Sequence, residues 1–257
     1  MRQLAVFFAL LLTLATTVSA ESFTPLTLPT QLNLVGTINS SLKIRMSLMR
    51  KGRDLTGSYF YENRKKNITL RGVVTDAGYL ELDEYGAKDS ITGHLIGVYT
   101  RDQELLGFWS KDDASTSPKL PLWLVVEGKG SPSPSHKFEV VNAPVRRDRG
   151  MAQLLVVDGI VLGFSYENVG GNAHTCTMIV DRSEQTLVWK DDVQGTSIFF
   201  TKEYFNQTQQ TAKVVIQKYE AGYNITFDGF LSYFCGARAI LPAKLTIRKG
   251  AKGWMGQ

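Results

Sequence analysis

The chain has few of the residues from which metal and thiol sites are built. Its 257 residues include two cysteines, Cys176 and Cys235, and three histidines that are scattered along the sequence. A structural zinc site takes four closely spaced cysteine and histidine ligands, a pattern that is missing here. The G-x-S-x-G, H-E-x-x-H and phosphate-binding glycine motifs are missing as well. We therefore expect no metal, no cofactor and no catalytic activity.

Long apolar runs are confined to the first twenty residues. Arg2 precedes the apolar stretch Leu4 to Leu14, and Val18-Ser19-Ala20 has the small residues of a cleavage site. This pattern predicts a signal peptide, residues 1–20, that is cleaved after Ala20. The apolar stretch is too short for a membrane anchor, and no later run is long enough for a second one. We expect a periplasmic or secreted protein without a transmembrane span.

A clustered basic stripe is also missing. The net charge is +5, and removal of Arg2 with the signal peptide leaves 28 lysines and arginines against 24 acidic residues. Nucleic-acid-binding proteins usually concentrate their positive charge on one face, so we expect no nucleic-acid partner. The mild positive excess instead favours an envelope polymer or an acidic protein as the partner.

Sustained helical periodicity is missing, whereas alternation with a period of two is frequent. Short apolar-alternating segments, among them Leu42 to Met49 and Leu55 to Glu62, are separated by turns rich in glycine, aspartate and asparagine. Glycines inside these segments indicate bends or bulges, which favour a curled sheet or a small barrel. The sequence predicts an all-β fold of two curled antiparallel meander or barrel-like domains.

The boundary between the two halves lies in the segment GKGSPSPSHK, residues 128–137, which is rich in serine and proline and has no apolar periodicity. We place the N-terminal β-meander domain at residues 21–128 and a linker at residues 129–136. The C-terminal domain, residues 137–257, contains both cysteines. In an exported protein two cysteines are expected to form one disulfide, here Cys176–Cys235.

Two basic turns lie at opposite ends of the predicted strand 55–62. At about 3.3 Å per residue they are roughly 26 Å apart, so they cannot form one continuous patch. Either turn could bind an anion, but solvated turn residues that discourage edge-to-edge aggregation are the simpler interpretation. The candidate residues are Arg50, Lys51, Arg53, Arg64, Lys65 and Lys66.

Aromatic and acidic residues provide the remaining candidates. Four aromatic side chains, which could form a ligand platform or fill the core, are Tyr59, Tyr61, Tyr85 and Trp109. The best acidic cluster is Glu81, Asp83 and Glu84. Glu81 and Asp83 share a strand face at roughly 7 Å, a separation that could serve glycoside hydrolysis. Their alternation with leucines favours a solvated outer face.

The segments GSYFYE, TGHLIG and GFWS follow one another in the first half, over roughly residues 34–125. With these segments the first half resembles a family of uncharacterised exported bacterial β-meander proteins. In the second half, the short segments HTC and FCGARAILP resemble periplasmic lysozyme inhibitors, although this half is longer and has fewer cysteines. These resemblances imply a β fold in the cell envelope and an inhibitor-like function.

Taken together, these features predict an exported, non-catalytic binding protein of the cell envelope. Its ligand would be an envelope polymer or a protein partner. Two alternatives remain open at this stage. A secreted hydrolase should bring carboxylates or a histidine together in a pocket, and a structural or assembly protein should leave a sheet edge uncovered.

Overall fold

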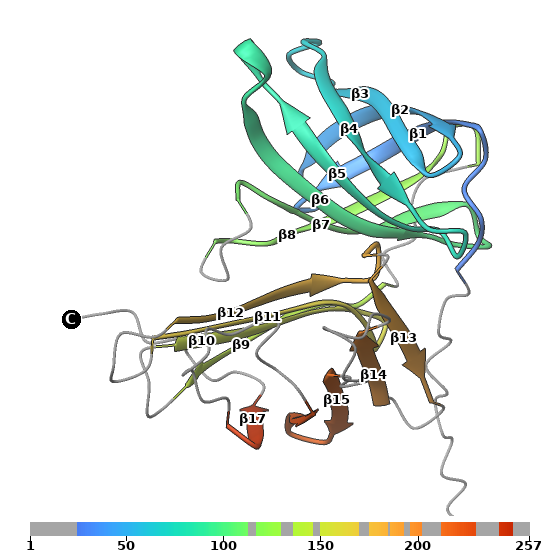
Figure 1. Ribbon diagram of the computed structural model, residues 1–257. Helices are drawn as coiled ribbons and strands as arrows, with labels where there is room; N and C mark the ends of the chain where they lie inside the picture. Colours follow the sequence, from blue (N-terminus) through green and yellow to red (C-terminus); the bar gives the residue numbers. More distant parts are fainter. Residues whose placement is uncertain are drawn as a thin grey trace, which may run out of the picture.

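The protein is built from antiparallel β-strands in three layers (Figure 1). This computed structural model describes residues 25–112, 117–129, 136–145, 150–169, 175–184, 186–192, 196–201, 212–229 and 242–248. Apart from one short 3-10 helix, all regular structure in these ranges is β, so the all-β prediction is confirmed. The predicted signal peptide, residues 1–20, lies outside the described residues.

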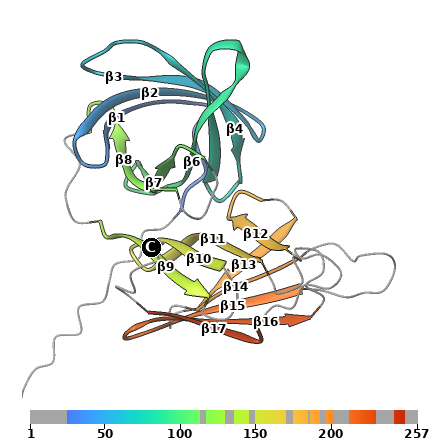
Figure 2. The same ribbon diagram turned by 90° about the vertical axis from the view of Figure 1, so that its left-hand side faces the viewer.

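The first layer is a closed barrel in which each strand pairs with its neighbours in chain order, and β1 pairs with β8. Figure 2 shows this barrel from the side that is on the left in Figure 1. The strands are β1 (Gln31–Ile38), β2 (Leu42–Lys51), β3 (Asp54–Tyr61), β4 (Ile68–Val74), β5 (Tyr79–Tyr85), β6 (Ile91–Tyr99), β7 (Glu104–Ser110) and β8 (Leu120–Val126). The short helix η1 (Ala87–Asp89) lies between β5 and β6. The predicted meander is therefore confirmed, and it closes on itself.

Alternation of side chains along each strand fills the barrel. On β5, for example, Leu80 and Leu82 are buried, whereas Glu81 and Asp83 face outward. Glycine allows the strands to approach one another closely. A Cβ at Gly72 would lie 1.9 Å from the backbone oxygen of Glu81 on the neighbouring strand, so no larger residue fits there. The strand glycines thus permit the tight curl that closes a barrel.

One end of the barrel is covered by the segment that precedes β1. Leu28 is 2% exposed and belongs to the barrel core. The backbone nitrogen of Leu26 donates to the oxygen of Tyr99 at 2.8 Å, which ties the segment to the end of β6. The basic turn Arg64–Lys66 and helix η1 lie at the opposite end.

The second half consists of two sheets that enclose one core. The four-stranded sheet contains β9 (Phe138–Val145), β10 (Gly150–Val157), β11 (Ile160–Val169) and β12 (Thr175–Asp181). The five-stranded sheet contains β13 (Leu187–Asp191), β14 (Thr196–Thr201), β15 (Ala212–Tyr219), β16 (Gly222–Gly229) and β17 (Lys244–Arg248). Phe164 and Met178 from the first sheet pack with Phe199 and Ile225 from the second.

The four-stranded sheet lies between the barrel and the five-stranded sheet (Figure 1). Its strands therefore bury both faces. Leu154 and Val156 of β10 face the core shared with the five-stranded sheet, whereas Leu155 and Val157 join an apolar cluster with Phe108 on the outside of the barrel. A continuous apolar stretch such as LLVV is typical of a strand that is covered on both sides. Independent folding of the two halves stays a prediction.

Candidate functional site

A groove lies where the outer face of the barrel meets the four-stranded sheet. The barrel contributes outward-facing residues of β5, β6 and β7, and the sheet contributes β10, β11 and β12. The cavity measures about 160 Å³. Its walls combine the apolar residues Ile96, Phe108 and Leu155 with charged and polar side chains at both ends. Interfaces between packed units are frequent positions for ligand sites, so we treat this groove as the candidate site.

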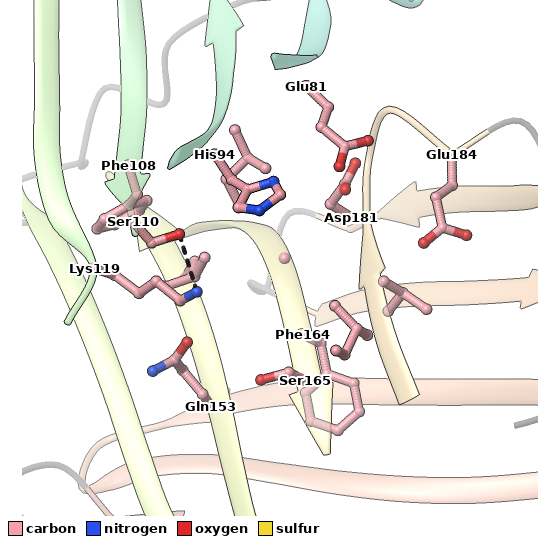
Figure 3. Close-up of a pocket in the computed structure, with 15 residues that line it drawn as sticks. Glu81, His94, Phe108, Ser110, Lys119, Gln153, Phe164, Ser165, Asp181 and Glu184 are labelled. Atoms are coloured by element: carbon pink, nitrogen blue, oxygen red, sulfur yellow. Dashed lines mark hydrogen bonds between the residues drawn. The ribbon is translucent and has the colours of Figure 1, made fainter. Parts of the chain in front are cut away.

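Three carboxylates gather at one end of the groove (Figure 3). Glu81 comes from the barrel, Asp181 ends β12, and Glu184 follows in the turn toward β13. Ser183 links two of these acids, because its backbone nitrogen donates to Asp181 Oδ1 at 2.6 Å and its hydroxyl donates to Glu81 Oε2 at 3.4 Å. The acidic end is thus formed from both halves of the chain.

Crowding of these carboxylates changes the protonation of Glu184. Burial raises the pKa of Glu184 to about 7, and the negative charges of Asp181 and Glu81 act in the same direction. Near neutral pH this carboxyl group therefore exchanges between its neutral and ionised forms. A cation placed in the groove would favour the ionised form and would release the proton.

The wall formed by the four-stranded sheet carries a hydroxyl group that has no hydrogen-bond partner among the described residues. Ser165 is 7% exposed, its Oγ is fully buried, and its side chain lines the groove. Beside it, Gln153 is 3% exposed and its Nε2 donates to Asn142 Oδ1 at 2.9 Å. Figure 3 shows Ser165 and Gln153 in the wall of this groove. A buried polar atom without a partner costs free energy, which a bound hydrogen-bonding group would recover.

Lys119 lies at the other end of the groove, and His94 lies between Lys119 and the carboxylates (Figure 3). Lys119 Nζ donates to Ser110 Oγ at 3.2 Å and to the backbone oxygen of Asp112 at 3.0 Å. His94 Nδ1 lies 2.7 Å from Asp83 Oδ1, its cross-strand neighbour. The groove therefore has three carboxylates at one end and one lysine at the other.

One part of the acidic prediction is wrong. Glu81 and Asp83 face outward as expected, but Glu84 points into the barrel and is 4% exposed. The reason is strand parity, since Glu84 shares the inward face with Leu80 and Leu82. Tyr59 Oη and Trp109 Nε1 both donate to Glu84 Oε1.

The structure brings three of the four predicted aromatic residues together. Tyr59, Tyr61 and Trp109 meet near Glu84 at the end of the barrel, and the rings of Tyr59 and Tyr61 are 5.5 Å apart. Tyr59 is 1% exposed, so it is a core residue. Tyr85 lies on the outer face, where the guanidinium of Arg71 lies 4.6 Å from its ring centre.

The basic turn residues have different surroundings. Arg50 is 12% exposed in its side chain and donates to Asp76 Oδ1 and the backbone oxygen of Leu28. Arg53 Nη2 donates to the backbone oxygen of Ser183 at 3.1 Å, across the interface. The prediction that all six are solvated is therefore wrong for these two arginines. The side chains that do face solvent are Lys51, Arg64, Lys65 and Lys66.

Cys176 is 1% exposed in the core between the two sheets. Its predicted partner Cys235 lies outside the described residues, so the disulfide stays a prediction. Residues 130–135 of the predicted linker also lie outside them.

Sequence reasoning missed Asp181, Glu184 and Ser165 as site residues. Asp181 and Glu184 flank a turn, and Ser165 alternates with apolar neighbours on β11, so local patterns mark all three as ordinary. They become a site only because the four-stranded sheet packs against the barrel. No local signal in the sequence reports that packing.

Comparison with known proteins returned no match to a protein-family model, a curated protein or a solved structure. In the described ranges, no helix is long and apolar enough to cross a membrane. Nor do the described histidine, cysteine, aspartate and glutamate side chains form a group of three or more that could hold a metal ion.

Proposed function

We propose that the protein is an exported, non-catalytic binding protein that takes a positively charged group into the groove between the barrel and the four-stranded sheet. The group would be a lysine or arginine side chain of a protein partner, or an amine on an envelope polymer. The observation that carries this proposal is the convergence of Glu81, Asp181 and Glu184 at one end of the groove. Three carboxylates in a partly buried space favour a cation through simple charge attraction.

The size of the groove agrees with this ligand. About 160 Å³ holds one amino-acid side chain rather than an extended polymer chain. The apolar walls at Ile96, Phe108 and Leu155 suit the methylene stem of a lysine or arginine, while the carboxylates take its charged end. Ser165 Oγ offers a further hydrogen bond inside the groove.

Calorimetric titration with acetyl-lysine amide and acetyl-arginine amide tests the proposal. We expect binding that weakens at least severalfold in Glu184→Gln and Asp181→Asn, whereas Glu220→Gln, in an exposed turn of the same half, leaves it unchanged. Because binding a cation favours ionised Glu184, affinity should rise between pH 6 and pH 8. Absence of binding by either amide, together with a failure of envelope extract to yield a basic partner, would contradict the proposal.

A second function is favoured by the pKa of Glu184. A carboxyl group with a pKa of about 7 beside further carboxylates resembles the arrangement in which glycoside hydrolases divide acid and base roles between two residues. Release of reducing ends from cell-wall glycan by the wild-type protein, with loss of this activity in Glu184→Gln, would support the hydrolase. Cation binding without hydrolysis would support the binding protein.

A further inference from the structure

The two halves of the molecule are also joined by a histidine that lies between two carboxylates. His136 Nε2 lies 2.7 Å from Glu104 Oε2, and its Nδ1 lies 2.6 Å from Asp158 Oδ2. Glu104 begins β7 of the barrel, whereas Asp158 lies in the turn between β10 and β11. All three side chains are at most 15% exposed. The imidazole therefore bridges the barrel and the four-stranded sheet away from the groove.

Local structure holds the sheet-side carboxylate in place. Asp158 and Gly159 form the two-residue turn between β10 and β11, with φ angles of 49° and 86°. Aspartate followed by glycine is a preferred pair for such a hairpin turn, because both positions need positive φ. The backbone nitrogen of Lys137 donates to Asp158 Oδ1 at 2.7 Å, and the nitrogen of Asp158 donates back to the oxygen of Lys137 at 3.0 Å.

The barrel-side carboxylate is held in a similar way. Trp123 Nε1 lies 3.4 Å from Glu104 Oε1 and donates to it. The indole ring of Trp123 also meets the imidazole ring of His136 edge to face, with ring centres 5.4 Å apart. Each carboxylate thus uses one oxygen for a fixed donor and directs the other oxygen at His136.

These two contacts determine which form of the histidine fits. A carboxylate oxygen can only accept, and a neutral imidazole has a single N–H to donate. In the neutral form, one of the two short contacts would set a nitrogen lone pair against a negative oxygen. The imidazolium donates from both nitrogens and satisfies both carboxylates at once.

The two carboxylates at the bridge also favour the imidazolium through their charge. Burial lowers the pKa of His136, but hydrogen bonds to Asp158 and Glu104 and the charges of these two groups outweigh burial and raise the pKa above 6.5. Two lysines lie nearby. Lys137 Nζ pairs with Glu139 Oε1 at 2.8 Å, and Lys218 of β15 has its Nζ beside Gly159.

We propose that His136 is a proton-operated latch, which holds the barrel against the four-stranded sheet while the imidazole is protonated and loosens this junction when the proton leaves. Because the folded-state pKa is raised, the stabilisation is complete below about pH 6.5 and is lost as the pH rises through the folded-state value. Each unit by which docking raises the pKa of His136 corresponds to about a tenfold difference, between low and high pH, in the ratio of docked to open molecules.

The first test is an NMR titration of the histidine ring protons in the full mature chain. We expect one ring, assigned by its loss in His136→Gln, to titrate above pH 6.5, and to move toward 6.5 in Asp158→Asn. A His136 ring that titrates at or below pH 6.5 would overturn the proposal that protonated His136 holds the two halves together.

The second test measures opening of the interface. Leu155 is 8% exposed and belongs to the apolar cluster between barrel and sheet. The rate of thiol labelling in Leu155→Cys is divided by the rate in Met49→Cys, because Met49 is exposed. This ratio removes the pH dependence of the thiol itself. We expect it to rise severalfold between pH 6 and pH 9, as the imidazole loses its proton.

Two variants make the labelling result specific. In His136→Gln the ratio should be high and independent of pH, because glutamine cannot donate to both carboxylates. Glu62→Gln removes an exposed ion pair of the barrel with Arg45, away from the residues that line the groove, so it should retain the wild-type rise. A flat ratio in the wild-type background, or the same rise in His136→Gln, would refute the proposal.

Discussion

Trp109 Nε1 donates a hydrogen bond to the carboxylate of Glu84, a residue that is 4% exposed at one end of the barrel. Tyr59 donates to the same oxygen, so two aromatic side chains from different strands meet on a single acid. Burial raises the pKa of Tyr59, and the charge of Glu84 adds to this effect, which keeps the phenol protonated as a donor. The barrel end is therefore closed by a polar cluster in addition to its leucines.

Replacement of Glu84 should reveal the strength of this cluster. In Glu84→Ala, Tyr59 and Trp109 both lose their acceptor, and we expect the free energy of unfolding to fall by about 2–4 kcal/mol. Glu84→Gln keeps an acceptor oxygen and should cost less than the alanine change. Urea unfolding measures both values. Glu62→Ala, which removes an exposed ion pair with Arg45, provides the control and should cost no more than about 1 kcal/mol.

Glu184 predicts a dependence of stability on pH. Its folded-state pKa of about 7 exceeds the ordinary value of 4.5, so the folded form binds the proton more tightly. The stabilisation that this proton provides is complete below about pH 4.5 and disappears as the pH rises through 7. At pH 8, Glu184→Gln should therefore be more stable than the wild type by about 1–2 kcal/mol, a value reduced for solvent screening.

Near pH 4.5 the two proteins should unfold at the same denaturant concentration. Glu220→Gln, in an exposed turn, should follow the wild type at both pH values. If the difference between wild type and Glu184→Gln were independent of pH, the acidic end would not be as crowded as the structure indicates.

The two basic turns should respond differently to mutation. Arg53 bonds across the interface to the backbone of Ser183, and Arg53→Ala should lower the free energy of unfolding by about 1–2 kcal/mol. Lys66 is exposed in the turn between β3 and β4, so Lys66→Glu should change it by no more than about 0.5 kcal/mol. Chemical denaturation of both variants checks this contrast. An equal loss in the two would show that neither turn is anchored as described.

The extent to which sequence alone could anticipate these features differs between fold and site. Alternation and strand glycines such as Gly72 predict a curled meander, because each strand has one face toward a core. The same alternation places Glu84 on the inward face with Leu80 and Leu82, apart from Glu81 and Asp83, although acidic residues are rarely buried. The groove could not be predicted from the sequence, since Glu81 and Glu184 are about a hundred positions apart and meet only when the barrel and the four-stranded sheet pack. Arg53 appeared solvated for the same reason.

The predicted disulfide offers a test of how the second half is stabilised. Cys176 is buried between the two sheets, and Cys235 is about sixty residues further along the chain. A disulfide that closes a loop of this length stabilises a protein by about 4 kcal/mol in chain-entropy estimates. The double change Cys176→Ser and Cys235→Ser should therefore lower the melting temperature of the second half more than that of the barrel.

The buried position of Cys176 adds a cost for the serine hydroxyl, so Cys176→Ala with Cys235→Ala is the matched variant. Mass spectrometry of the mature protein without reductant should give a mass two hydrogens below that of the dithiol. Two titratable thiols in the folded protein would contradict the disulfide, and the melting difference between the serine and alanine pairs would then measure only the packing of Cys176.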